Sequence, residues 1–328
     1  MTQRVGLKPN EEEYILMGWA ALGDPDRLYL KIKSEFFEEI SPYSAKISLR
    51  HNLHRGCLGW APELQTLQDL ADICAATQRI YEECFEHLCQ HALSMTHSKN
   101  LVLSGGCALN CVANSIAARY FDDVWIMPNP GDAGSSLGAV AAWIGKKIEW
   151  PGPYLGYDIP GKYPKNKIIT ELIKNKIVGV ANGRAEFGPR ALGNRSLFAD
   201  PRGHDVKDRV NKIKNRQEFR PFAPVILEEH AGDYFDGVAG PYMQFTSKCK
   251  YPDLYPAIVH LDGTSRVQTV NKYQHEGLYA TLKQWYEQTG CPMILNTSLN
   301  IKGQPMVDDE MDAERWEKKY KVRVLTHD

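Results

Sequence analysis

The chain has 328 residues, of which 43% are hydrophobic and 24% charged, and its net charge at pH 7 is −1. This length allows two ordinary domains that each bury a core, and the nearly neutral balance excludes a protein that binds polyanions through bulk charge. The charge is unevenly distributed, because residues 162–220 contain 15 Lys and Arg against 6 Asp and Glu. Such a local surplus attracts anions such as phosphate, nucleotides or nucleic acid.

The cysteines and the hydrophobic runs bear on the cellular location. The eight cysteines form no CxxC pair, and the sequence contains no stretch typical of a signal peptide. We therefore expect reduced thiols in a cytoplasmic protein. No run of 18 apolar residues is present, so no membrane-spanning helix is expected.

The first half of the chain predicts alternating helices and strands, after an opening stretch that cannot be assigned. Residues 67–95 carry apolar side chains at helical spacing, which predicts a long amphipathic helix. Strands at 100–103 and 124–127 end in glycine-rich loops, and these loops precede helices at 108–119 and 133–142. This order indicates an α/β layer architecture.

The second half follows a candidate linker at residues 151–164, which is rich in proline and glycine and marks a predicted domain boundary. Beyond it the pattern again mixes the two kinds of element. The predicted helices cover 167–175, 206–213 and 278–287, and the predicted strands cover 177–181, 224–227, 257–261 and 293–296.

The first motif that could carry chemistry follows the strand at 100–103. Gly105 and Gly106 would let the backbone approach a ligand closely, and the next helix N-terminus could receive a phosphate or a ribose. Asn110 lies on that helix and could bind the same ligand. The alternative is a tight turn without a ligand.

The second motif places Asp132 between glycines at the start of a small-residue helix, where a metal ligand would fit. The alternative is an N-capping aspartate, because one carboxylate does not make a metal site. His87 and His91 share a helix face, but the glutamates around them favour a solvated surface.

The third motif is a cluster of arginines and glycines at residues 183–196, followed by a second basic segment at 214–220. Guanidinium groups hold phosphate and carboxylate oxygens with two parallel hydrogen bonds, and glycine loops can wrap a small anion. We therefore predict an anion site here, with Glu186 as a residue that could orient one of the arginines. Its cations are Arg184, Arg190, Arg195, Lys214, Arg216 and Arg220.

The fourth motif consists of short polar side chains in residues 262–268 and 296–300, which could contact a nucleotide. The alternative is ordinary turn formation by Asp, Asn, Ser and Thr. No nucleophile elbow and no Walker-type phosphate loop is present.

Together these stretches resemble the carbamoyltransferase family of antibiotic and nodulation-factor biosynthesis. The resemblance is carried by SGGCALNCVAN (104–114), NPGDAGSSLGA (129–139), GRAEFGPRALGNRSLFADPR (183–202), KNRQEFRPFAP (214–224), HLDGTSRVQTV (260–270) and NTSLNIKGQP (296–305), with a weaker match in MGWAALGDP (17–25).

The resemblance implies an α/β fold of two parts. Residues 1–150 would be one lobe of an actin/Hsp70-like (Kae1-like) domain that lacks its N-terminal lobe. Residues 165–328 would be a YrdC-like domain that forms carbamoyl-adenylate from carbamoyl phosphate and ATP with Mg²⁺.

The resemblance also assigns roles to individual residues. Lys214 with Arg216 matches the KxR signature of the family, and Ser298 with Asn300 matches SxN. Asp132 matches a metal aspartate of the Kae1-like domain. The implied catalytic residues are Lys214, Arg216, Arg184, Arg190 and Arg220. The implied substrate and nucleotide contacts are Arg195, Ser196, Arg266, Asn296, Ser298, Asn300, Gly105, Gly106 and Asn110.

The match begins after the point where family members carry an HxxxH pair, so the partner ligands of Asp132 have no counterpart here. We therefore expect an O-carbamoyltransferase, or a subunit of one, whose transfer step needs the missing lobe from a partner protein; a homo-oligomer is the alternative assembly. An iron-like divalent metal would bind only with that lobe. The alternatives are a fragment, a chain that keeps only the adenylate-forming step, or a non-catalytic anion- or nucleic-acid-binding protein. The hydroxyl-bearing acceptor cannot be predicted.

Overall fold

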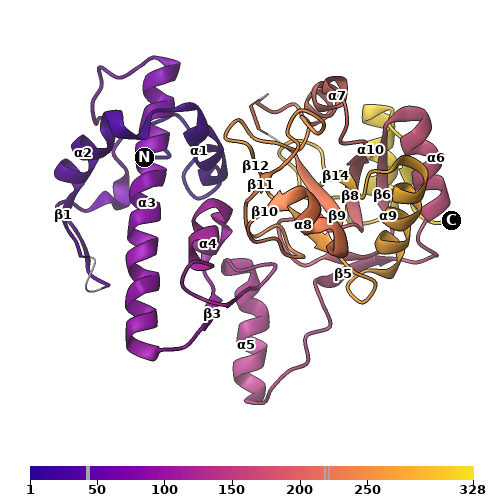
Figure 1. Cartoon of the computed structure of the whole chain (residues 1–328), viewed down its shortest axis with the longest axis horizontal. Coiled ribbons are helices and arrows are strands. Elements are labelled where there is room, and N and C mark those ends of the chain that lie inside the picture. The colour runs from indigo at the N-terminus through magenta and orange to yellow at the C-terminus, as the bar shows by residue number, and fades with distance from the viewer. Residues whose placement is uncertain (42–44, 218, 221) are drawn as a thin grey trace. The chain divides into compact units, whose positions relative to one another are not determined.

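The computed structural model of the chain describes residues 1–41, 45–217, 219–220 and 222–328. The chain is a mixed α/β protein with several sheets, as expected (Figure 1). It divides into two compact units. Unit 1 comprises Met1–Leu103 and Leu109–Trp125, and unit 2 comprises Ser104–Ala108 and Ile126–Asp328.

Unit 1 is built on one long helix, α3 (Leu67–Thr96), which is the longest helix in Figure 1. It begins at a capping box in which the side chains of Thr66 and Asp69 accept each other's backbone N–H groups. It ends at His97, which adopts the left-handed conformation with φ of 53°. These signals account for the agreement with the predicted helix at 67–95.

The other elements of unit 1 are short. They are α1 (Glu13–Trp19), the 3-10 turns η1 (Ala20–Leu22) and η2 (Leu53–Arg55), α2 (Pro25–Phe36), α4 (Cys111–Ala117), and the strand pairs β1 (Phe37–Ile40) with β2 (Ile47–Leu49) and β3 (Asn100–Leu103) with β4 (Asp123–Ile126). The turn η3 (Gly106–Leu109) precedes α4.

The segment before α2 packs closely against α3. A Cβ atom on Gly23 would lie 2.1 Å from the carbonyl oxygen of Ala71, so only glycine allows this approach. Asp24 then caps α2 by accepting the N–H of Asp26 at 2.9 Å, and Pro25 occupies the first turn. The LGDP part of the weaker motif therefore serves the fold of unit 1.

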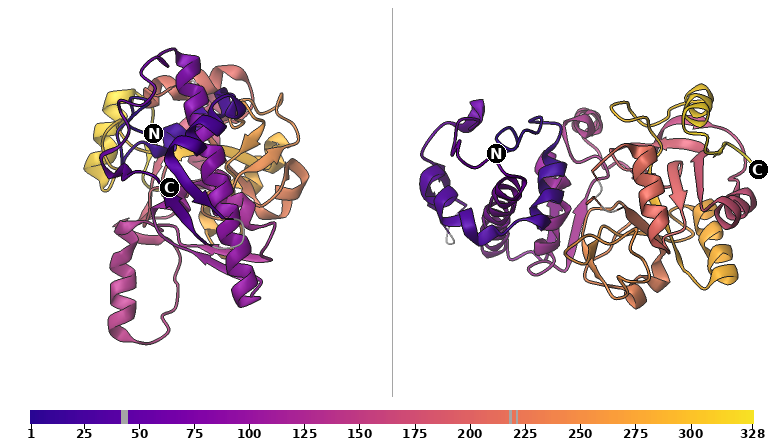
Figure 2. Two further views of the ribbon diagram at one scale, coloured as in Figure 1. Left: turned by 90° about the vertical axis from the view of Figure 1, so that its left-hand side faces the viewer. Right: turned by 90° about the horizontal axis from the view of Figure 1, so that it is seen from above.

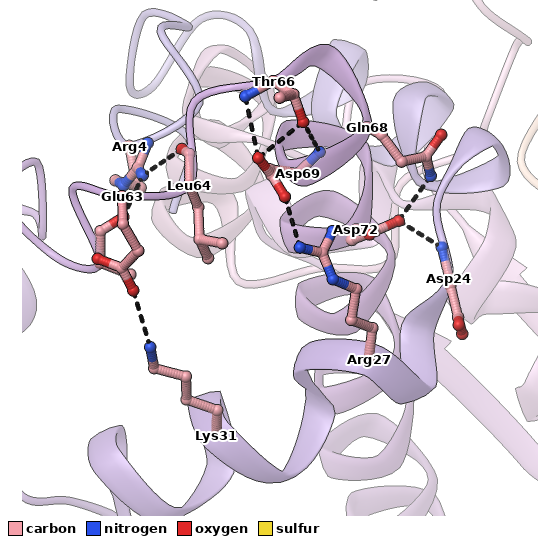
Figure 3. A network of polar contacts seen from close by, with 11 residues as sticks. Arg4, Asp24, Arg27, Lys31, Glu63, Leu64, Thr66, Gln68, Asp69 and Asp72 are labelled. Carbon is pink, nitrogen blue, oxygen red and sulfur yellow. Dashed lines mark hydrogen bonds and ion pairs between the residues drawn. The ribbon is translucent and has the colours of Figure 1, made fainter.

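A polar network fixes α2 to α3 (Figure 3). The guanidinium of Arg27 donates to Asp69 at 2.6 Å and to Asp72 at 2.5 Å. The second oxygen of Asp72 accepts the backbone N–H of Asp24 at 2.7 Å and the side chain of Gln68 at 2.8 Å. These bonds lower the pKa of Asp69 to about 2 and also lower the pKa of Asp72. Both carboxyl groups are therefore ionised when they join the two helices.

Unit 2 contains a six-stranded sheet in the order β13-β9-β14-β8-β6-β15. Its strands are β6 (Ile177–Ala181), β8 (Arg195–Ala199), β9 (Ala223–Leu227), β13 (Gln268–Val270), β14 (Met293–Ser298) and β15 (Val324–Leu325). The central strands β9, β14, β8 and β6 alternate in direction, while β13 and β15 run parallel to their neighbours.

Helices cover both faces of this sheet. One core cluster joins it to α7 (His204–Lys214) and α10 (Glu310–Tyr320), with Val210 and Trp316 as buried contacts. The other cluster joins it to α6 (Lys165–Asn175) and α9 (Glu276–Thr289), with Leu172 and Trp285 buried. The strands are buried on both faces, which explains their almost continuous apolar sequence.

The smaller elements of unit 2 lie outside this sheet. They are η4 (Asp132–Gly134), α5 (Ser135–Ile144), η5 (Glu228–His230), α8 (Ala231–Tyr234), the sheet of β10 (Phe235–Asp236), β11 (Ser247–Cys249) and β12 (Thr264–Ser265), and the pair of β5 (Tyr154–Ile159) and β7 (Gly183–Glu186). Figure 2 shows α5 standing apart from the six-stranded sheet, and none of its residues is buried.

Most predicted elements are confirmed, but two stretches differ. The proline-rich stretch 151–164 is not a simple linker, because β5 pairs within it to β7 and its Ile159 is fully buried. The strand predicted at 257–261 is wrong, since this segment forms turns with short local hydrogen bonds such as Ile258 N–H to the carbonyl of Tyr255 at 3.1 Å. Its buried apolar residues Ala257, Ile258 and Val259 produce the strand-like pattern.

Among the described residues, no helix is long and apolar enough to cross a membrane.

Candidate anion site

The predicted anion-binding residues gather at one end of the six-stranded sheet. Because its central strands alternate in direction, the end of β6, the start of β8, the end of β14 and the start of β9 lie at the same edge. The pairing of Ser196 with Ser298 confirms this for β8 and β14. The segments that meet there are 182–194, 215–217, 219–220, 264–267 and 299–306, which carry most of the predicted residues.

Lys214 ends α7 and reaches the end of β14. Its ammonium donates to the carbonyl of Ser298 at 2.7 Å, to the hydroxyl of Ser298 at 3.2 Å, and to the side-chain oxygen of Asn300. The Ser298 hydroxyl also donates to Asn300 at 2.8 Å. The amide of Asn300 is fixed by the carbonyls of Ile301 at 3.1 Å and Gln304 at 3.0 Å, which orients its oxygen toward Lys214.

The charge on Lys214 is costly in this position. Burial, followed by the nearby cations Arg216 and Arg220, lowers the pKa of Lys214 to about 7. Its three oxygen partners among the described residues are neutral, so none of them carries a charge that offsets the desolvation. A bound anion would supply the missing negative charge.

Arg216 and Arg220 lie on the segment that enters β9. The guanidinium of Arg216 stacks 3.9 Å from the centre of the Phe222 ring and donates to the carbonyl of Arg220 at 3.0 Å. A further bond joins its Nε to Asn211 at 3.3 Å. Arg220 donates to the side chain of Gln217 at 3.4 Å. Three cations of the predicted cluster thus occupy one short segment.

Arg195 has a different role from the predicted one. Its side chain is fully buried, and its guanidinium donates to the backbone carbonyls of five residues at 2.9–3.3 Å. All its N–H donors point to peptide groups, so it offers none to a ligand and joins separate segments of the fold instead. The five residues are Tyr157, Asn182, Gly183, Asn194 and Asp308.

The remaining arginines of the third motif are more open. Arg184 is exposed in β7 and donates to the carbonyl of Leu155 at 3.2 Å. Arg190 is half-buried on the loop between β7 and β8. Glu186 binds no guanidinium; one of its oxygens accepts the backbone N–H groups of Leu192, Asn194 and Arg195. Among the described residues Glu186 therefore forms no ion pair with a guanidinium, and it fixes the backbone of the arginine-rich loop instead.

Several predicted contacts contain buried polar atoms that have no hydrogen-bond partner within the described residues. These atoms are the hydroxyl of Ser196, the side-chain oxygen of Asn296 and the Nε of Arg266. The amide of Asn296 is satisfied, because it donates to Ala191 at 3.0 Å and to Gln268 at 2.7 Å. Unpaired buried polar groups destabilise a fold, so their concentration at this edge is typical of a ligand site.

The glycines of the first motif lie beside the loop that carries Asp132. The N–H of Gly105 donates to the carbonyl of Pro130 at 2.7 Å, and a Cβ on Gly131 would lie 3.9 Å from the Cα of Gly106. Space is open around the Cα atoms of both Gly105 and Gly106. A ligand could therefore approach this backbone closely.

Asn110 fits its structural alternative, whereas the side chain of Asp132 caps neither η4 nor α5. Asn110 caps α4 by accepting the N–H of Ala113 at 3.1 Å, and its amide donates to Gln78 at 3.0 Å. Asp132 is exposed in η4. Within the described residues, no three His, Cys, Asp or Glu side chains gather as a metal site would require, so Asp132 alone does not fit a metal.

A shallow cavity of about 190 Å³ adjoins the arginine-rich loop. Its wall includes Trp150, Tyr154, Tyr242 and Gln268. Tyr154 and Gln268 also hold the loop, since both donate to the carbonyl of Leu192, at 3.2 and 3.0 Å.

Comparison with known proteins connects this geometry to a family. Residues 1–141 match the model of the carbamoyltransferase N-terminus, and residues 169–328 match that of the carbamoyltransferase C-terminus. The chain belongs to the carbamoyltransferase family. Nodulation proteins are among its relatives, as the resemblance predicted.

Two of these relatives illustrate the match. Nodulation protein NolO of Bradyrhizobium diazoefficiens is 32% identical over 92% of this chain. Nodulation protein U of Sinorhizobium fredii is 37% identical over 67% of it. The chain spans 62% of the length of NolO and 43% of the length of nodulation protein U.

Proposed function

We propose that unit 2 activates carbamoyl phosphate with ATP and Mg²⁺, so that the chain acts as an O-carbamoyltransferase or a subunit of one. The observation that carries this proposal is the half-buried Lys214, held by Ser298 and Asn300 beside Arg216 and Arg220. In this proposal, residues 165–328 form the YrdC-like domain, and residues 1–150 form part of a Kae1-like domain.

The proposed reaction has two steps. Carbamoyl phosphate is first hydrolysed to carbamate and phosphate. A carbamate oxygen then attacks the α-phosphorus of ATP, which forms carbamoyl-adenylate and releases pyrophosphate. Each step gathers negative charge on phosphate oxygens, which fixed cations stabilise best in a site that excludes water.

The chain's own residues divide this work. Lys214 and Arg216 meet the phosphate oxygens, Arg184, Arg190 and Arg220 add positive charge around them, and Ser298 and Asn300 orient Lys214. Ser196, Asn296 and Arg266 offer their unpaired polar atoms to the nucleotide or to the carbamoyl group. No step is assigned to a resident metal, because Asp132 has no partner ligands within the described residues.

Transfer to a hydroxyl-bearing acceptor is the second part of the proposal. Gly105 and Gly106 would contact the nucleotide of the intermediate. A protein partner would supply the Kae1-like lobe that carries further ligands. The family resemblance leaves several acceptor classes open, which are an antibiotic, a sugar and a modified nucleobase.

A pyrophosphate assay tests the activation step. The chain, ATP, Mg²⁺ and carbamoyl phosphate should release pyrophosphate, and leaving out carbamoyl phosphate should abolish the release. Release by the chain alone would place adenylate formation in it. The absence of release, together with salt-sensitive DNA binding, would instead support a non-catalytic nucleic-acid-binding protein.

A further inference from the structure

Residues 187–194 form the loop between β7 and β8. In the second half of this loop, nearly every peptide group forms a hydrogen bond with another part of unit 2. The carbonyl of Ala191 accepts from Asn296 at 3.0 Å, and the carbonyl of Leu192 accepts from Gln268 at 3.0 Å. The carbonyl of Gly193 accepts from the hydroxyl of Tyr163 at 2.9 Å. These side chains come from three separate elements or loops, so the loop is fixed from several sides.

Glu186 holds the N–H groups of the same segment. Its Oε1 accepts from Leu192 at 2.7 Å, Asn194 at 2.8 Å and Arg195 at 3.2 Å. The carboxyl group is buried, and this burial raises its pKa against the effect of the three bonds. One buried acceptor thus gathers three N–H groups that a loop would otherwise expose to water.

His275 completes the arrangement from the start of α9. Its Nδ1 accepts the N–H of Leu278 at 3.1 Å, so the other ring nitrogen carries the proton and donates to Asn194 Oδ1 at 2.7 Å. The amide of Asn194 donates to the carbonyl of Arg184 at 2.8 Å. The ring lies between those of Tyr154 and Tyr163, and burial lowers the pKa of His275 to about 4. The imidazole is therefore neutral, with one defined tautomer.

This loop carries Arg190, and its bonds also fix the backbone of Arg184. We propose that Glu186 and His275 are positioning residues of the anion site, which set these two arginines for the phosphate of carbamoyl phosphate before it binds. The inference rests on the proposed function. A preformed loop avoids the entropy that ordering two arginines on binding would cost.

Two substitutions at His275 separate its two bonds. In His275→Asn the side-chain oxygen can take the place of Nδ1 and keep the cap of α9, while the bond to Asn194 is lost. In His275→Gln the amide can take the place of Nε2 and keep the bond to Asn194, while the cap is weakened. We expect H275N to raise the KM for carbamoyl phosphate about tenfold with kcat nearly unchanged. H275Q should lower the unfolding temperature and leave that KM close to the wild-type value.

Glu186→Gln has a matched control in the same unit. Glu171 is also buried and accepts two side-chain bonds, from Asn175 and Arg323, at the opposite end of the sheet. We expect E186Q to raise the KM for carbamoyl phosphate about tenfold without changing the KM for ATP. Glu171→Gln should change only stability. An unchanged KM in both E186Q and H275N would overturn the proposal.

Binding of inorganic phosphate separates this inference from the proposed reaction. If the wild-type chain shows no turnover, calorimetric titration with phosphate should still rank E186Q and H275N below the wild type and E171Q. That outcome would support the positioning role while the proposed reaction fails. If the wild-type chain shows no turnover and binds no phosphate, the proposed reaction and the positioning role both fail.

Discussion

Arg195, which is fully buried, and Lys214, which is half-buried, are two cations at the same edge of one sheet, and they have different roles. Arg195 uses all its donors on peptide carbonyls, and its own carbonyl accepts the N–H of Leu299 at 2.9 Å. Among the described residues Lys214 bonds to Ser298 and Asn300, and desolvation lowers its pKa to about 7. A cation whose N–H donors all bind backbone carbonyls stabilises the fold. A cation whose positive charge has only neutral partners is suited to bind an anion.

The largest effect on stability is expected at Arg195. Arg195→Met would leave five buried carbonyls without this donor, and each such loss costs about 1–3 kcal/mol before relaxation. We expect the free energy of unfolding to fall by about 3 kcal/mol or more, as measured by urea denaturation. The free energy of unfolding of Arg195→Lys should lie between those of the wild type and Arg195→Met. An unchanged urea midpoint in R195M would remove the distinction between the two cations.

Lys214→Met should show the opposite pattern. Pyrophosphate release should fall about 100-fold, because a cation that stabilises the developing charge is lost. The unfolding temperature should stay near the wild-type value or rise, since a costly buried charge is removed. Equal losses of activity and stability would assign Lys214 to the fold rather than to the reaction.

The pH dependence of stability sharpens the same contrast. The pKa of Lys214 is about 7 in the folded chain and near 10.5 when unfolded, so between these values the unfolded chain binds more protons. The burial penalty is therefore complete below pH 7, and stability rises above it by up to about 1.4 kcal/mol per pH unit. From pH 7 to 9 the free energy of unfolding of the wild type should therefore rise relative to that of K214M. A constant difference would contradict the lowered pKa.

A smaller effect is expected at Gly188 on the arginine-rich loop. Its φ is 149°, and a Cβ atom would lie 2.6 Å from the carbonyl oxygen of Pro128. Gly188→Ala should lower the free energy of unfolding by about 1–3 kcal/mol. It should also increase amide hydrogen exchange in the loop around Gly188 and in the segment around Pro128. Gly138→Ala in α5 is the control, because nothing lies within 4 Å of the added atom. Similar stability of the two variants would show that the close approach does not constrain the loop.

The smallest effect is expected at Arg27 in unit 1, whose side chain is 42% exposed. Its bonds help lower the pKa values of Asp69 and Asp72, so their contribution is present above pH 4 and is lost as the pH falls toward 2. Arg27→Met should move the acid-unfolding midpoint to a higher pH, followed by circular dichroism. Matching acid midpoints would mean that the network in Figure 3 adds little to the stability of unit 1.

Much of the secondary structure could be predicted because local signals agree with the tertiary environment. The capping box at Thr66 and Asp69 marks the start of α3, and the continuous apolar runs mark the buried strands of unit 2. The family resemblance assigned Lys214, Ser298 and Asn300 to one site, and the structure joins them by hydrogen bonds.

The misses arise where partners are distant in the sequence. Arg195 was grouped with ligand-binding arginines because its burial depends on carbonyls as far away as Asp308. His275 lies 81 positions from Asn194, and no spacing rule relates the two. A signal was available for Asn110, since an asparagine three residues before Ala113 at a helix start is typical of an N-cap.

The strand β5 determines where this chain can be divided for expression. Its Ile159 fills the core of unit 2, and the carbonyl of Tyr157 is one of the acceptors of Arg195. A piece that starts at residue 165 would lack both and would leave β7 without its neighbour. Gln244 also donates to the carbonyl of Met127 at 3.0 Å, so an autonomous form of unit 2 should include the chain from Ile126 onward rather than begin within the proline-rich stretch.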